Sequence, residues 1–317
     1  PRVLEKQMRM QSMAYIGAMS LGAAVYDPAL MQRLVTLLGL NVKLTQAISL
    51  RFPLYLTFIF AIMTLLTTLR MEENPSPTEP AYKPEGNFAP SIWQAFKLTL
   101  QAGGWILNTP FALVVILAGL MFDNCLRMVT TLNSQYYRLI DLPEASFGLI
   151  GSGLALLGLI IPRLAHRMVN RHTPAYNLGI MTAVSIAGLI GMTFFFPVIG
   201  LLPVALLVVV MYMGRFFQSH YLNRITASHQ RATVLSFKGL SFNLAYGVIG
   251  VLYALLLAAL RPQLALSQPH LGSAALENMV FIKSIGWFPW YFLLTIVVLL
   301  VVARRQLKNT DVHRKTG

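Results

Sequence analysis

The sequence predicts an all-α integral membrane protein with about eight transmembrane helices. Hydrophobic residues make up 56% of the 317-residue chain and charged residues only 11%, whereas a soluble domain carries about 25% charged residues. The apolar residues gather into runs close to the roughly 20 residues that a helix needs to cross a bilayer. These runs do not alternate between polar and apolar residues, as the strands of a membrane barrel would.

Eight apolar runs follow one another along the chain. Each is expected to be a helix, because lipid offers no hydrogen-bond partner to an open backbone. The first run is closed by Asp27 and Pro28. A polar stretch at 70–97 separates the second run from the third, and its five prolines and lack of an apolar period predict a loop. The predicted spans cover approximately residues 11–32, 48–69, 104–130, 145–163, 175–197, 200–221, 236–260 and 285–303.

The distribution of Lys and Arg predicts the orientation of these spans. Eighteen of the 25 basic residues fall in segments on the side of the N-terminus, six fall on the opposite side, and Arg127 lies inside a span. Connections rich in Lys and Arg stay in the cytoplasm. Both termini are therefore predicted to be cytoplasmic, in a multi-pass protein of the inner or plasma membrane. The basic residues form no single patch, so the net charge of +14 does not indicate a nucleic-acid partner.

The spans differ in polarity, which predicts which of them face lipid. The second span over residues 52–69 and the eighth over 290–303 carry no charge and can face lipid. The third and seventh spans carry charges or amides and are expected to face protein or water. The fifth span has small residues at every fourth position, which predicts a stripe that packs against another helix. These residues are Gly179, Ala183, Ala187 and Gly191.

The third span carries the most informative polar residues. Asp123 and Arg127 are four residues apart, so they share one helix face within reach of an ion pair, and Asn124 lies beside them. A charge inside a span costs roughly 2.5–3.5 kcal/mol on insertion scales, so it needs a partner or a water-filled cavity. Two interpretations remain open: a neutralised pair that locks the helix to its neighbours, and a proton- or substrate-handling site.

The seventh span places several polar or small residues on one face, at helical spacing. This face could line a cavity or could form hydrogen bonds between helices. Its members are Lys238, Gly239, Asn243, Tyr246, Gly250 and Tyr253. Arg215, near the end of the sixth span, is interpreted as a side chain that extends to the cytoplasmic interface.

The chain is not predicted to be an enzyme, and no cofactor or metal is expected. The six histidines lie in connections or at span ends without metal-binding spacing, and Cys125 is the single cysteine. The run Gly151-Ser152-Gly153 is interpreted as helix packing, because no acid or histidine stands ready to activate the serine. No phosphate-binding glycine loop is present, so an ATP-driven pump is disfavoured.

Two segments resemble bacterial transporters of the major facilitator superfamily. The run Arg231-Ala232-Thr233-Val234-Leu235-Ser236, preceded by Tyr221-Leu222-Asn223-Arg224, resembles the family's tenth-to-eleventh connection and the start of its eleventh helix. Residues 162–171 resemble the family's loop G-x-L-A-D-R-x-G-R-R, with Pro162, His166 and Val169 in place of the Gly, Asp and Gly of that pattern.

This resemblance implies helices 5–12 of a twelve-helix fold. Residues 1–69 would be the last two helices of the N-terminal half, 70–103 the central cytoplasmic loop, and 104–317 the complete six-helix C-terminal half with its tail. The first four helices would be missing, so this chain alone is not expected to transport. The corresponding gating-loop candidates are Arg163, His166, Arg167 and Arg171.

The predicted function is secondary active transport by alternating access, driven by the proton gradient and acting on a small-molecule substrate. Asp123 is the candidate titrating group, Arg127 its partner or a contact for an anionic substrate, and Asn124, Asn243 and Tyr246 candidate hydrogen-bonding groups of the cavity. The resemblance favours efflux over uptake by symport or facilitated diffusion. A non-transporting receptor or scaffold is an alternative. A membrane-embedded enzyme is disfavoured because, apart from Asp27 where the first run closes, Asp123 is the single acidic residue within a span.

Overall fold

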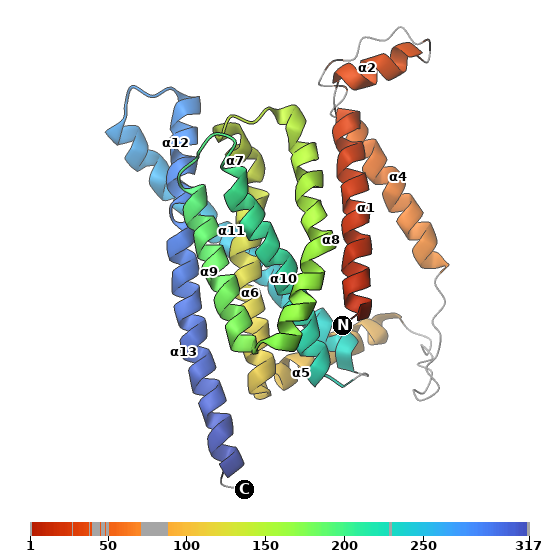
Figure 1. The fold of residues 1–317 in the computed structure, drawn as a ribbon, viewed down its shortest axis with the longest axis vertical. Coiled ribbons are helices and arrows are strands. Elements are labelled where there is room, and N and C mark those ends of the chain that lie inside the picture. Colours follow the sequence, from red (N-terminus) through yellow and green to blue (C-terminus); the bar gives the residue numbers. More distant parts are fainter. Residues whose placement is uncertain are drawn as a thin grey trace.

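The computed structural model describes residues 2–26, 28–37, 51–70, 88–227 and 230–315, together with residues 39, 45 and 48. This part of the chain is helical and contains no strand. Figure 1 shows an upright bundle in which α1 begins and α13 ends toward the same end. The elements are α1 (Arg2–Tyr26), α2 (Pro28–Leu37), α4 (Phe52–Leu69), α5 (Phe88–Asn108), α6 (Pro110–Thr131), α7 (Asn133–Leu139), the 3-10 turn η1 (Glu144–Ser146), α8 (Phe147–Arg171), α9 (Pro174–Met192), α10 (Leu201–Ile225), α11 (Arg231–Ser267), α12 (Ser273–Ile285) and α13 (Phe288–Lys315).

Seven helical segments in the described part of the chain are long and apolar enough to cross a membrane: α4, α6, α8, α9, α10, α11, and α12 with α13. The chain is therefore an all-α, multi-pass membrane protein. The remaining predicted span, 11–32, corresponds to α1, which ends earlier than predicted, at Tyr26. Its charged first turns and its many small residues make α1 less apolar than the other spans, yet it runs along α8 (Figure 1).

Small residues of α8 allow α1 to approach closely. A Cβ atom at Gly151 would lie 2.6 Å from Cε of Met19, and one at Gly158 would collide with Ser12 and Tyr212. Ser152 forms a hydrogen bond of 2.9 Å with the hydroxyl of Ser20. The predicted packing role of the 151–153 run is confirmed for Gly151 and Ser152, whereas Gly153 faces open space.

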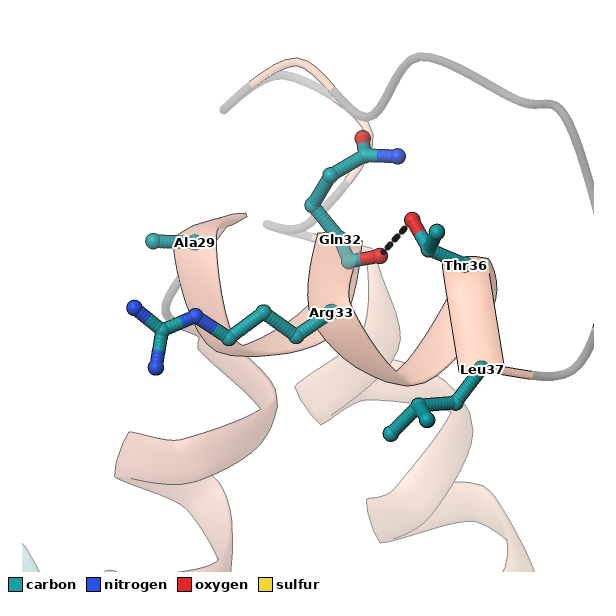
Figure 2. Close-up of a pocket in the computed structure, with 5 residues that line it drawn as sticks. All are labelled: Ala29, Gln32, Arg33, Thr36 and Leu37. Atoms are coloured by element: carbon teal, nitrogen blue, oxygen red, sulfur yellow. Dashed lines mark hydrogen bonds between the residues drawn. The ribbon is translucent and has the colours of Figure 1, made fainter.

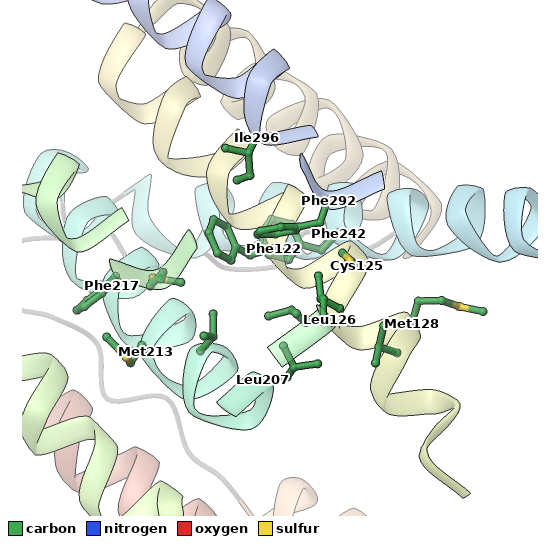
Figure 3. Close-up of a cluster of buried hydrophobic side chains, with 14 of the residues drawn as sticks. Phe122, Cys125, Leu126, Met128, Leu207, Met213, Phe217, Phe242, Phe292 and Ile296 are labelled. Carbon is green, nitrogen blue, oxygen red and sulfur yellow. The ribbon is translucent and has the colours of Figure 1, made fainter. Parts of the chain in front are cut away.

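The core of the bundle surrounds α6. Ten of its 22 residues are buried, and the helix packs against α10, α11 and α13. Figure 3 shows Phe122 and Phe292 side by side between α6 and α13, with their ring centroids 5.2 Å apart. The expectation that the third span faces protein is confirmed for this helix.

The two charge-free spans behave differently from each other. No residue of α4 is buried, which agrees with a helix that faces lipid. By contrast, α13 buries one side, including Phe292 and Leu299, against α6 and α9, while Trp290 and Leu294 on its other side are exposed. The lipid-facing prediction therefore holds for only one side of α13, because aliphatic residues suit a protein interior as well as lipid.

Three local predictions are wrong. The predicted loop and central linker are helical from Phe88 onward, where α5 begins, while residues 71–87 lie outside the described part of the chain. The segment 163–171 is no loop, because α8 continues through Pro162 to Arg171. The predicted packing stripe of α9 is exposed at Gly179, Ala183 and Ala187, and it meets α10 at its end, where Gly191 lies against Pro203. The buried side of this helix instead includes Asn177 and Ser185.

Candidate functional site

The candidate site lies on α6, where Asp123 and Arg127 form an ion pair one helical turn apart. Nη2 of Arg127 donates a hydrogen bond to Oδ2 of Asp123. The two side chains are half-buried, with 30% of Arg127 and 17% of Asp123 exposed. The predicted pair is therefore present, and it stays partly accessible.

α11 completes the site from the facing helix. Nη1 of Arg127 donates to Oδ1 of Asn243 over 3.1 Å, and the guanidinium lies 5.0 Å from the ring centroid of Tyr246. The hydroxyls of Tyr246 and Thr131 are 2.8 Å apart. Because this guanidinium binds an acid, an amide and an aromatic face at once, it connects the ion pair directly to α11.

Asn124 does not join this group. A neighbouring residue on a helix points about 100° away, and Asn124 is buried toward α13, where its Nδ2 donates to the hydroxyl of Tyr291 over 3.1 Å. Its Oδ1 is buried without a hydrogen-bond partner. The structure thus brings together Asp123, Arg127, Asn243 and Tyr246 of the predicted set, and places Asn124 on another side of α6.

The predicted polar face of α11 is divided. Asn243 and Tyr246 contact α6, whereas Tyr253 pairs with Ser284 of α12 at 3.0 Å between hydroxyls. Among the described residues, no atom beyond the local backbone of α11 lies within 4 Å of the Cβ position of Gly239 or Gly250. Along α11, the predicted face therefore has three different surroundings: the site at Asn243 and Tyr246, the contact with α12 at Tyr253, and open space at the two glycines.

Two further cations, Lys238 and Arg215, were not assigned to the site from the sequence, and Lys238 interacts electrostatically with Asp123. Lys238 of α11 is half-buried with its Nζ 5.3 Å from the ring centroid of Phe242, and it also interacts electrostatically with Arg215. Arg215 of α10 is exposed and also interacts with Tyr15 of α1. The signal was available in the sequence, since both cations lie well inside long apolar helices.

The gating-loop candidates lie on the final turns of α8. Arg163 pairs with Glu5 of α1 at 3.5 Å, and His166 packs edge-on to Phe216 of α10, with its Nε2 3.2 Å from the amide nitrogen of Asn170. Arg167 and Arg171 are exposed. Arg163 and His166 thus connect α8 to α1 and α10. No contact in the described part of the chain joins the four candidates to the Asp123–Arg127 pair.

A separate hollow lies beside α2, far from these charges in the fold. Figure 2 shows its lining, which comes from this one helix. The hydroxyl of Thr36 donates to the carbonyl of Gln32 over 2.7 Å, so this polar group serves the helix backbone. The lining residues are Ala29, Gln32, Arg33, Thr36 and Leu37. One helix with a single charge offers no converging set of groups for catalysis or selective binding.

Within the described residues, no three His, Cys, Asp or Glu side chains gather in a way that could hold a metal ion. Comparison with protein families, curated proteins and solved structures gives no match to this chain.

Proposed function

We propose that this protein is a proton-coupled secondary transporter of the major facilitator type, in which the Asp123–Arg127 pair on α6 is the coupling element. The half-buried ion pair in an apolar, centrally packed helix is the observation that carries the proposal. Ionisable residues inside membrane helices typically mark proton or substrate pathways.

The hydrogen-bond network suggests how proton binding could be linked to movement. Protonation of Asp123 removes the charge that holds Arg127, because a neutral acid forms a weaker hydrogen bond with a guanidinium. Arg127 is then free to change its contacts with Asn243 and Tyr246 on α11. One proton on α6 would thus alter the α6–α11 contact, as an alternating-access carrier requires.

Two further features support a major facilitator architecture. The motif-bearing segment at 231–236 begins a long apolar helix, α11, as the resemblance implies. Moreover, α1 precedes the Pro-rich stretch and α8 follows it, yet the two pack together along their length. On this proposal both termini are cytoplasmic, efflux of small molecules is the favoured direction, and uptake or facilitated diffusion is the alternative.

The proposal is tested by reconstituting the polypeptide, as its host cell makes it, in liposomes and measuring substrate flux driven by a proton gradient. Flux should fall to background in Asp123→Asn and persist in Asp141→Asn, a matched change in the exposed connection after α7. Asp141 has φ of 61°, a conformation that asparagine also tolerates, so this control should fold normally.

The outcomes separate the alternatives. Substrate flux that does not depend on the pH gradient and is unchanged in Asp123→Asn would mean that the ion pair only holds α6 to its neighbours. This outcome would favour a facilitator without proton coupling. Lack of flux for every substrate, with a folded protein, would favour a non-transporting receptor or scaffold.

A further inference from the structure

We infer that α5 binds the surface of a bilayer that carries anionic lipids, with its exposed apolar stripe in the headgroup region. The stripe consists of Trp93, Phe96, Leu100 and Leu107. The observation that carries this inference is the division of one helix into a buried, a polar and an exposed apolar side, at the end of a bundle whose helices can cross a membrane. The inference does not depend on transport.

The second half of α5 is fixed to the bundle. Ala102, Gly103 and Ile106 are buried, and a Cβ atom at Gly103 would lie 2.4 Å from the ring of Phe237 on α11. The helix packs against both α11 and α6. Figure 1 shows α5 lying across the end of the bundle at which α1 begins. This helix therefore runs across the spans rather than along them.

One exposed side of α5 is apolar. Successive residues of a helix are about 100° apart, so Trp93, Phe96, Leu100 and Leu107 follow one another along a single stripe. Their side chains are between 47% and 67% exposed. The rings of Trp93 and Phe96 stack on each other, with their centroids 5.7 Å apart. In water this stripe would leave a row of large apolar groups uncovered, so it indicates an apolar environment on this side of the helix.

A polar stripe runs beside the apolar one. Its exposed members are Gln94, Lys97, Gln101 and Asn108. By the same helical spacing, the polar stripe lies roughly opposite the buried side, and the apolar stripe lies about 100° from each of them. A helix on a membrane surface has this arrangement, because its polar side faces water while its apolar side reaches the boundary between headgroups and acyl chains.

The residue types and the surrounding charges favour an anionic lipid surface as the partner. Tryptophan is enriched where a protein meets the membrane interface, and Lys97 can extend from the polar stripe toward lipid phosphates. Exposed arginines lie in the last turns of α8 and α10, at Arg171 and Arg224, which Figure 1 shows near α5. Glu5 near the start of α1 is paired with Arg163. This end of the bundle therefore presents cations to the headgroups, which attract anionic lipids.

The inference is tested with spin labels on the full chain in nanodiscs of phosphatidylcholine and phosphatidylglycerol. Cys125 is replaced by Ala so that each variant has a single thiol. Oxygen concentrates in lipid, whereas a nickel complex stays in water. Labels at Phe96→Cys and Leu100→Cys should collide several-fold more with oxygen than with the nickel complex, as a label at Phe58→Cys on the exposed helix α4 should. The matched control Gln101→Cys, on the polar stripe, should show the reverse preference.

Two outcomes would overturn the inference. A Phe96→Cys label that meets the nickel complex as readily as the Gln101→Cys label would show that the apolar stripe faces water. Labels at Phe96→Cys and Leu100→Cys that are shielded from both reagents would show that protein covers the stripe.

A second measurement tests the charge of the lipid. The Phe96→Cys label should move more slowly in nanodiscs with phosphatidylglycerol than in phosphatidylcholine alone, and Lys97→Gln should reduce this difference. Lys283→Gln, an exposed lysine of α12 at the far end of the bundle in Figure 1, should leave the difference unchanged. Equal motion in both lipids, or an equal effect of the two lysine variants, would overturn the assignment of an anionic lipid surface.

Discussion

α4 and α6 are almost equally apolar, and each is long enough to cross a membrane. No residue of α4 is buried, whereas α6 buries ten residues and packs against three other spans. They differ in polar groups: the hydroxyls of α4, such as Thr64, bond to the backbone of their own helix, while the polar groups of α6 bond across to α11 and α13. The position of a helix in the bundle therefore depends on what its polar groups need rather than on its total apolarity.

The largest effect is expected where α6 meets α13. Phe292→Ala removes a fully buried ring that contacts Phe122, and the cavity should lower the free energy of unfolding by about 3 kcal/mol. Phe58→Ala on α4, where the ring is 66% exposed, should change it by less than about 0.5 kcal/mol. Unfolding in mixed micelles by titration with dodecyl sulfate measures both. Equal losses would mean that α4 also packs against protein.

The second comparison, with a slightly smaller expected loss of stability, is between single and double variants of the ion pair on α6. Asp123→Leu leaves Arg127 without its counter-charge inside α6, which should destabilise the protein by about 2.5 kcal/mol. Replacing Arg127 by Leu as well should restore most of this loss, because no unpaired charge remains. The same unfolding measurement applies to the single and double variants. A double variant as unstable as the two single losses combined would show that the partners act independently.

The third comparison tests whether replacing a glycine lowers stability only where two helices are in contact. Gly158→Leu on α8 should destabilise the protein by about 2 kcal/mol, because the new side chain collides with Ser12 and Tyr212. Gly179→Leu on α9 has open space and should change stability by less than about 0.5 kcal/mol. Thermal unfolding in detergent compares them. A large loss of stability in Gly179→Leu would indicate that this side of α9 does pack against another helix, as the sequence predicts.

The spans and the ion pair are predictable from the sequence because each depends on residues close together along the chain. Apolar runs and a spacing of four residues depend on one helix alone, so Asp123 and Arg127 are recognisable without the fold. The contact of Arg127 with Asn243 was predictable only as a shared polar character, because 116 residues separate them. The contact between Asn124 and Tyr291 likewise joins residues 167 apart in the sequence, and it arises from helix packing, which no local pattern encodes.

The wrong predictions have the same origin. Residues 88–103 contain no apolar run, so helix α5 was missed, although it packs against α11 with Gly103 against Phe237. On α9 the small residues share a face, but the buried face is the one with Asn177, whose amide donates to the hydroxyl of Tyr221 over 2.9 Å. This hydrogen bond depends on how α9 and α10 are arranged in space, so the pattern within α9 alone does not predict it.

The placement of Asp123 and Arg127 on the same helix also bears on how the protein is made. Both partners enter the bilayer with one segment, before α11 has been synthesised, and residues four apart can pair as soon as α6 has coiled. The insertion machinery would therefore receive a helix with no net charge at this level. Had the partners been on α6 and α11, each helix would have to enter the lipid with a bare charge and wait more than a hundred residues of synthesis for its neutralisation.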